Sequence, residues 1–267
     1  MNGDERRVPT RRELRAREAE PARRPRGGRP DAGRIAPWRV VVGVIGELML
    51  TAGVLVLLFI GWKLWVNDAS VDRQQEQAAG ELAQQWADQT GDGSTESTAE
   101  PDDPSVTPQG HDQFGVMYVQ RLGDTWQRPI ARGVEKKEVL DKMGLGWYPT
   151  TQLQGQVGNF AVAGHRGGYG ASLRYVDSLT VGDHIVVETA DGWYDYRYRN
   201  SEYVMDSAVD VLDPVPQQTT APDARLLTLT TCNPYPFTNG ERLISYAVLD
   251  RFTPRAAGRP AVLDYLQ

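Results

Sequence analysis

Apolar residues along this chain form one long run near the N-terminus and several short runs after residue 113. The long run, Val40–Trp65, contains charge only at Glu47 and, near its end, Lys63. A membrane-spanning helix needs about 20 mostly apolar residues, so residues 38–66 are predicted to form one transmembrane helix. Tryptophans favour the membrane–water interface, and three of them mark the ends of this segment: Trp38, Trp62 and Trp65.

This apolar segment has two further interpretations. A cleavable signal peptide would also place an apolar run near the N-terminus, but this run is too long and no clear Ala-x-Ala site follows it. Glu47 is either a functional acid within the membrane or a side chain that packs against a partner helix or is tolerated near the cytoplasmic end. The sequence leaves the role of Glu47 open.

The short runs after residue 113 have the length and β-branched composition of strands. The sequence Ala190-Asp191-Gly192 separates two of them and signals a hairpin. Short helical turns are expected at residues 134–143 and 173–179. Many strands and few helices argue against a doubly wound α/β fold and predict an all-β closed barrel or sandwich. The expected strands cover residues 114–122, 155–164, 185–189, 193–205, 226–231 and 243–249.

Charge is distributed unevenly and predicts the orientation of the chain. Residues 1–39 hold twelve arginines and six acidic residues and carry +6, whereas the whole chain carries −6, so the remainder carries −12. Arginines beside a membrane helix favour the cytoplasmic side. The N-terminus is therefore expected in the cytoplasm and the later residues outside the cell. No binding of nucleic acid by the basic tail is expected, because a membrane segment follows it directly.

Composition divides the chain into five parts. The N-terminal tail is poor in aliphatic residues and is expected to be disordered. Asn67–Gln89 can be helical, but Leu82 and Trp86 are its only apolar pair, so it is not expected to join a core. Thr90–Gly110 has the composition of a flexible acidic stalk. The predicted order is tail, transmembrane helix, extracellular stalk, folded domain and C-terminal tail, at residues 1–37, 38–66, 67–112, 113–255 and 256–267.

The chain has one cysteine, Cys232, which ends an apolar strand-like run. An exported domain with one cysteine cannot form an internal disulfide, which leaves intermolecular pairing or a reactive thiol, or a buried structural thiol. Arg242 precedes the next strand, and a hairpin would bring it to the same rim of a sheet as Cys232. A thiol and a guanidinium on rigid strands suit acyl chemistry, which also needs a group that accepts and donates a proton.

Among the three histidines, His165 is the best candidate for that group. It ends an apolar run, and the glycines after it suit a junction between a strand and a loop facing a cleft. His111 lies in a polar linker, and His184 lies at the start of an expected strand. His165 is therefore the predicted base.

Several motifs together resemble one known family. Thr228-Leu229-Thr230-Thr231-Cys232 matches the TLxTC signature of sortases, the cysteine transpeptidases of the Gram-positive cell envelope. Ala163-Gly164-His165 and Arg242 fall where that family keeps its histidine and arginine. The TCNP ending, the short loop from Cys232 to Arg242 and Gly146-Trp147-Tyr148 look most like class E sortases of actinobacteria, which usually have His-Tyr in place of Trp147-Tyr148. The resemblance covers roughly residues 114–252.

The resemblance implies an eight-stranded sortase-type β-barrel and a membrane-anchored cysteine transpeptidase. Cys232 would be the nucleophile, His165 the general acid and base, and Arg242 the donor to the oxyanion or the substrate backbone. Tyr148 and Thr231 would lie at the substrate site. The implied substrates are secreted proteins with a C-terminal sorting signal of LAxTG or LPxTG type. The signal is cleaved between Thr and Gly through a thioacyl enzyme, and the acceptor is an amine of a cell-wall precursor or a pilin.

Two other function classes remain as alternatives. A different cysteine enzyme of the wall, such as an L,D-transpeptidase, places Cys and Arg much closer together, with His and Gly just before the Cys. A membrane-tethered β-domain that binds envelope peptides without catalysis is the second. Asp183 and Glu188 lack the spacing of a metal cluster, and no glycine-rich phosphate loop is present, so no metal and no cofactor are expected.

Overall fold

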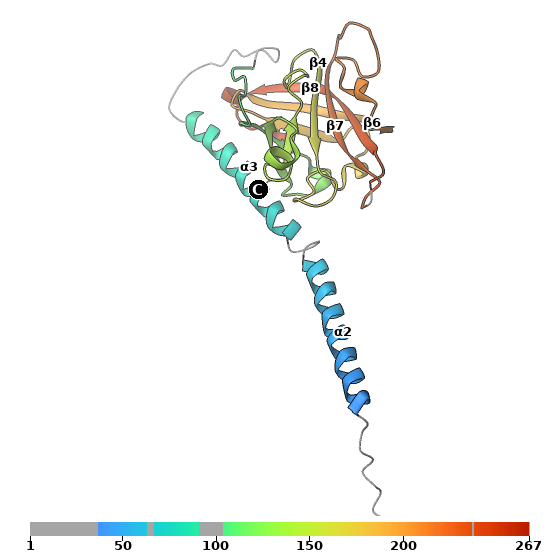
Figure 1. Ribbon diagram of the computed structural model, residues 1–267. Coiled ribbons are helices and arrows are strands. Elements are labelled where there is room, and N and C mark those ends of the chain that lie inside the picture. The colour runs from blue at the N-terminus through green and yellow to red at the C-terminus, as the bar shows by residue number, and fades with distance from the viewer. Residues whose placement is uncertain (1–36, 63–66, 91–103, 237, 267) are drawn as a thin grey trace, which may run out of the picture. The chain divides into compact units, whose positions relative to one another are not determined.

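The computed structural model of the chain describes residues 37–62, 67–90, 104–236 and 238–266 (Figure 1). Two compact units are distinguished, residues 1–55 and 56–267. The N-terminal tail and most of the expected flexible stalk lie outside the described residues, as do residues 63–66 of the expected membrane segment.

Helix α2, Pro37–Gly61, is the one helix in the described part of the chain that is long and apolar enough to cross a membrane. Its side chains are exposed along its whole length, including leucine, valine and phenylalanine side chains. Such a surface is unfavourable in water and suits a lipid environment. The prediction of one N-terminal membrane-spanning candidate is confirmed in length and composition.

The described residues of the second unit form a closed barrel of eight strands in the order β1-β2-β3-β4-β7-β8-β6-β5. The β2–β3 and β4–β7 pairs are parallel and the other pairs are antiparallel. The predicted all-β closed barrel is confirmed. The strands are β1 Gln113–Tyr118, β2 Gln127–Arg132, β3 Leu145–Trp147, β4 Gly158–Gly164, β5 His184–Glu188, β6 Gly192–Met205, β7 Arg225–Asn233 and β8 Glu241–Pro254.

Short helical turns connect the strands. The turn expected at residues 134–143 contains a π-helical turn, and the one expected at 173–179 contains a 3-10 turn. The short turns are Gln120–Leu122, Lys136–Leu140, Val176–Ser178, Val209–Leu212, Arg255–Ala257 and Ala261–Leu263.

The inside of the barrel is filled by large apolar side chains that alternate along the strands. Fully buried examples include Phe160 of β4, Tyr194 of β6 and Leu229 of β7. Trp147 of β3 belongs to the same core: its ring packs edge-on against Phe114 with 5.7 Å between centroids, and its N–H donates to the carbonyl of Gln152 at 2.9 Å. Trp147 is therefore a packing residue of the barrel interior.

Helix α3, Asn67–Thr90, packs against the outside of the barrel, where Figure 1 shows it beside the sheet. Ala79 is fully buried and Trp86 is 8% exposed. The expectation that this segment stays out of a core is therefore wrong. Buried residues of α3, β1, β5, β6 and the C-terminal turn form one layer, here called the outer cluster: Ala79, Trp86, Val116, Tyr118, Val186, Trp193 and Leu263.

Arg255 fixes the end of α3 to this layer. Its guanidinium carbon lies 5.7 Å from the ring centre of Trp86 and 4.5 Å from that of Trp193. The same guanidinium binds Glu188 at 2.9 Å, and both side chains of this ion pair are at most 10% exposed. Burial removes water from the guanidinium of Arg255. The two indole rings and the carboxylate of Glu188 compensate for that loss, which makes the contact specific.

Replacing Trp86 with alanine tests whether α3 folds together with the barrel as one unit, here called the head. Truncation of a buried tryptophan typically costs about 3 kcal/mol or more of stability, which corresponds to a fall in melting temperature of about 6–12 °C for a domain of this size. The neighbouring exposed Gln85 supplies the matched control, Gln85→Ala. Equal melting temperatures of the two variants in detergent, measured by intrinsic fluorescence, would contradict the docking of α3.

Candidate active site

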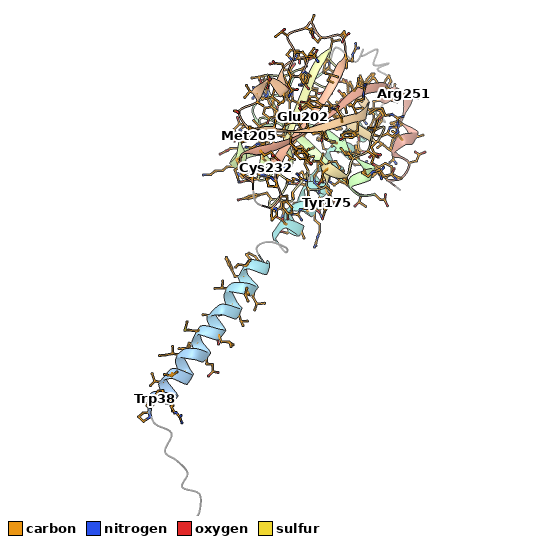
Figure 2. All side chains as sticks on the ribbon, turned by 90° about the vertical axis from the view of Figure 1, so that its right-hand side faces the viewer. Trp38, Tyr175, Glu202, Met205, Cys232 and Arg251 are labelled. Carbon is orange, nitrogen blue, oxygen red and sulfur yellow. The ribbon has the colours of Figure 1, made fainter. Side chains whose placement is uncertain are left out.

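Cys232 and Arg242 are direct partners across the antiparallel pair of β7 and β8. Arg242 in turn faces Val204 across β8 and β6. Cys232 and Met205, the last residue of β6, lie at the same end of the barrel (Figure 2). The described part of the chain holds Cys232 as a free, half-buried thiol. The hairpin inferred from the sequence thus brings the thiol and the guanidinium onto adjacent strands.

His165 directly follows β4, which runs parallel to β7 up to the pair Ala163 and Thr230. One residue later, the hydroxyl of Thr231 donates to the carbonyl of Gly164 at 2.8 Å. Beyond His165, the guanidinium of Arg166 binds the side-chain oxygen of Asn233. His165 therefore lies between two links to the residues on either side of Cys232, and the structure brings all three predicted catalytic residues to one rim.

Asp141 holds the ring of His165. The distance from Nε2 of His165 to Oδ1 of Asp141 is 2.7 Å, and both side chains are at most 14% exposed. The ammonium of Lys136 binds the same carboxylate at 2.8 Å, and this hydrogen bond raises the pKa of Lys136. The contact uses Nε2, which donates to the carboxylate when it carries the ring proton, and Nδ1 is the ring nitrogen that Asp141 does not engage.

Tyr169 stacks on the face of the His165 ring. Its ring stacks on His165 with 5.3 Å between centroids, and the ammonium of Lys136 lies 4.2 Å from the centre of the same ring. Lys136 therefore contacts both neighbours of His165, the carboxylate of Asp141 and the ring of Tyr169. The histidine ring is fixed by a carboxylate at its nitrogen and by an aromatic face.

The loop that carries Tyr169 has an unusual backbone. Four consecutive residues have positive φ, with 73° at Gly168, 54° at Tyr169, 80° at Gly170 and 42° at Ala171. Glycine adopts this conformation freely, whereas a residue with a Cβ loses roughly 1–2 kcal/mol in it. Contacts elsewhere must hold Tyr169 and Ala171 in place, because such strain persists only where the surroundings determine it.

Arg242 has two contacts besides its position opposite Cys232. Its Nη1 donates to the carbonyl of Glu241 at 3.0 Å, and its Nη2 lies 3.5 Å from the carboxylate of Asp206. The side chain of Arg242 is 31% exposed and that of Asp206 is 55% exposed. A guanidinium has five donor positions in a rigid fork, so these two contacts leave donors for a further ligand.

Tyr148 reaches the same rim, and Thr231 does not present its side chain there. The hydroxyl of Tyr148 lies 3.0 Å from Oγ1 of Thr230, and burial raises the pKa of Tyr148 against the opposing effects of that hydrogen bond and of Arg242. Side chains alternate along a strand, so Thr230 shares a face with Cys232. Thr231 points to the other face and is 3% exposed.

The other two histidines lie away from this rim, and so does a surface cavity. His184 bonds to Asp195 at 2.9 Å, and exposed His111 contacts the carbonyl of Arg132 at 3.2 Å. A cavity of about 350 Å³ is found on the outer face of the β1–β5 pair, away from Cys232. Its lining includes Tyr118, Arg121, Asp183, His184, Val262 and Tyr265.

Known proteins are similar to this chain in sequence and in fold. The family model of the sortase domain matches residues 117–250. Sortase SrtE1 of Streptomyces coelicolor is 36% identical over 252 residues, which cover 91% of this chain and 66% of SrtE1. Sortase SrtE2 of the same organism is 32% identical over 239 residues, covering 84% of this chain and 88% of SrtE2.

A solved structure carries the same barrel. The crystal structure of sortase E1 from Streptomyces coelicolor, with a tripeptide in its active site, superposes with a TM-score of 0.51 at 37% identity. The match covers 57% of this chain and 96% of that structure. The family model covers half of the chain, and SrtE2 aligns with most of both chains. This chain therefore belongs to the sortase family of cysteine transpeptidases and is similar to its class E members.

Proposed function

We propose that this chain is a membrane-anchored transpeptidase that cleaves a C-terminal sorting signal between Thr and Gly and transfers the protein to an amine. The observation that carries the proposal is the direct pairing of Cys232 with Arg242, together with the two bonds that link the neighbours of His165 to the neighbours of Cys232. A thiol, a proton-transfer group and a fixed cation are the three components that acyl transfer through a thioester requires.

The chemistry follows from the positions of these groups. The thiolate of Cys232 attacks the Thr carbonyl of the signal, and the resulting oxyanion accepts hydrogen bonds from Arg242. As the C–N bond breaks, His165 gives a proton to the amine of the departing Gly and leaves a thioacyl enzyme. An incoming amine then attacks the thioester, His165 takes its proton, and the thiolate of Cys232 leaves, which restores the starting state. In this ring orientation the proton exchange falls to Nδ1, because Asp141 holds Nε2.

A free cysteine has a pKa of about 8.5, so the fraction of thiolate near neutral pH depends on nearby positive charge. Arg242 on the adjacent strand supplies one such charge. A protonated His165 would supply a second, and the carboxylate of Asp141 would stabilise that imidazolium. The site therefore has the charges needed to form a thiolate and to transfer one proton per half-reaction.

The proposed signal is a pentapeptide of Leu-Ala-x-Thr-Gly type, accepted at least as well as Leu-Pro-x-Thr-Gly. The choice of this motif rests on the similarity to the class E sortases SrtE1 and SrtE2, and the tripeptide in the active site of sortase E1 supports a peptide substrate in general. The proposed acceptor is an amine of a cell-wall precursor or a pilin. Trp147, which stands where class E members usually have histidine, is part of the core and supplies no polar group to the rim.

Replacing Cys232 with alanine should abolish ligation, because no other thiol exists in the chain. The assay mixes the full chain in detergent with a Leu-Ala-x-Thr-Gly peptide and an amine panel, and mass spectrometry identifies the ligated product. A competing Leu-Pro-x-Thr-Gly peptide measures the preference for the second residue. Ligation by Cys232→Ala would contradict the assignment, and clear preference for the Pro peptide would contradict the proposed signal.

Arg242→Ala should lower turnover by about 10²–10³-fold, the usual effect of removing one oxyanion donor. Arg242→Lys should recover only part of the lost turnover, since an ammonium keeps the charge but lacks the planar set of donors of a guanidinium. The matched control is Asp206→Asn, which removes the ion pair and keeps the guanidinium. An exposed pair contributes about 0–1 kcal/mol to stability, so melting temperatures should change little. Near-normal turnover of Arg242→Ala would exclude the catalytic role.

The proposed location is the cell membrane, with the N-terminus in the cytoplasm and the barrel outside. The support is the arginine-rich segment before α2 and the acidic balance of the rest. Trypsin added to intact, wall-stripped cells should degrade the barrel and spare an epitope at the N-terminus. Loss of the epitope with survival of the barrel would show the opposite orientation, and permeabilised cells provide the control in which both are degraded.

A further inference from the structure

Gln75 of helix α3 is a buried polar residue that contacts the loop after His165. It is 1% exposed. Its Nε2 donates to the carbonyl of Tyr169 at 3.1 Å, and its Oε1 accepts from the hydroxyl of Ser172 at 3.0 Å. Both ends of its amide are therefore used by the segment whose positive φ angles need external support.

The space around Gln75 leaves little room for change in this loop. A Cβ added to Gly170 would lie 2.8 Å from Oε1 of Gln75, which leaves no room for a side chain there. A Cβ added to Gly144, three residues after Asp141, would lie 3.6 Å from Cδ of Gln75, so this turn lies near the same side chain. Gln75 therefore packs closely on the loop that carries Tyr169, whose ring stacks on His165.

Charged contacts fix this part of α3 on the barrel. Asp68 binds Arg174 at 2.6 Å, at the far end of the same loop. Arg128 of β2, whose side chain is 3% exposed, binds Asp72 and Glu76. Asp72 and Glu76 lie within one turn of Gln75, and Asp68 lies about two turns before it. The position of Gln75 is therefore determined by the docking of the whole helix, and any shift of α3 reaches the loop through it.

We propose that α3 is a brace for the catalytic histidine and that Gln75 is a positioning residue of the active site. Gln75 acts through the backbone of Tyr169, which places the tyrosine ring against His165. The role rests on the proposed function, since the orientation of His165 matters for turnover only if it transfers protons. Activity of the head then depends on α3, the helix that follows the membrane-spanning candidate in the sequence.

The test compares Gln75→Met with Gln84→Met in the full chain in detergent. Methionine keeps the length of glutamine and removes its hydrogen bonds, and Gln84 is an exposed glutamine of the same helix. Gln75→Met should lower kcat at least about tenfold through misplacement of the histidine. KM for the peptide should stay within about twofold and the pH dependence of kcat/KM should change. Gln84→Met should match the wild type in kcat, in KM and in the pH dependence of kcat/KM.

A double-mutant cycle asks whether Gln75 acts through Tyr169. If it does, Tyr169→Ala combined with Gln75→Met should lower kcat no more than Tyr169→Ala alone, because the second change removes an effect already lost. Multiplying losses would overturn the proposed route. Unchanged kcat and pH dependence in Gln75→Met would overturn the brace, as would a loss that merely follows the fraction unfolded at the assay temperature.

The rate of Cys232 alkylation by iodoacetamide as a function of pH separates this inference from the proposed function. Alkylation needs no peptide and reports the charge around the thiol. If the wild type forms no ligated product but Gln75→Met still changes the alkylation profile, the brace stands and the transpeptidase assignment fails. If the wild type ligates and neither the profile nor kcat changes in Gln75→Met, the brace fails alone.

Discussion

The antiparallel register of β7 and β8 is the constraint on which this site depends. It places Cys232 opposite Arg242 and sets which face of each strand meets the substrate side. A shift by one residue would exchange Thr231 for Cys232 at that position and turn the thiol to the other face. The register is secured by buried side chains along both strands, among them Leu229 and Leu243. Packing inside the barrel therefore fixes the chemistry at its rim.

A second layer of packing lies outside the barrel and connects distant parts of the chain. The outer cluster joins α3, strands β1, β5 and β6 and the C-terminal turn, and the guanidinium of Arg255 lies over the rings of Trp86 and Trp193. In its N-terminal half, the same helix contacts the loop after His165 through Gln75. The helix thus belongs to the head in two respects: it covers apolar surface, and it supports a strained loop of the site.

Six of the eight strands, the hairpin and the positions of Cys232, His165 and Arg242 were predictable from sequence because each has a local signature, whereas β2 and β3 were not among the expected strands. Apolar runs and turn residues mark the strands, and the TLxTC motif marks the nucleophile. The family match also removes the L,D-transpeptidase alternative. The roles of the three residues stay predictions, supported by their common location.

What the sequence did not reveal depends on contacts between distant residues. Asp141 lies 24 positions before His165, in a turn with no motif, and nothing in the chain marks it as the partner of the histidine. Helix α3 has no wide apolar stripe: its buried residues are Ala79, Trp86 and two polar residues, Asp68 and Gln75, whose burial depends on partners in the barrel. The amphipathic pattern that reveals most docked helices is therefore weak here.

The half-buried thiol has one further chemical consequence. Oxidation of a cysteine to the sulfenic acid is reversible, and many proteins protect that state by condensing it with a second cysteine. This chain has no second cysteine, so a sulfenic acid at Cys232 cannot be stored as an internal disulfide. Recovery of the reduced thiol depends on a reductant or a thiol from another molecule, and without one the oxidation continues to the irreversible sulfinic and sulfonic acids.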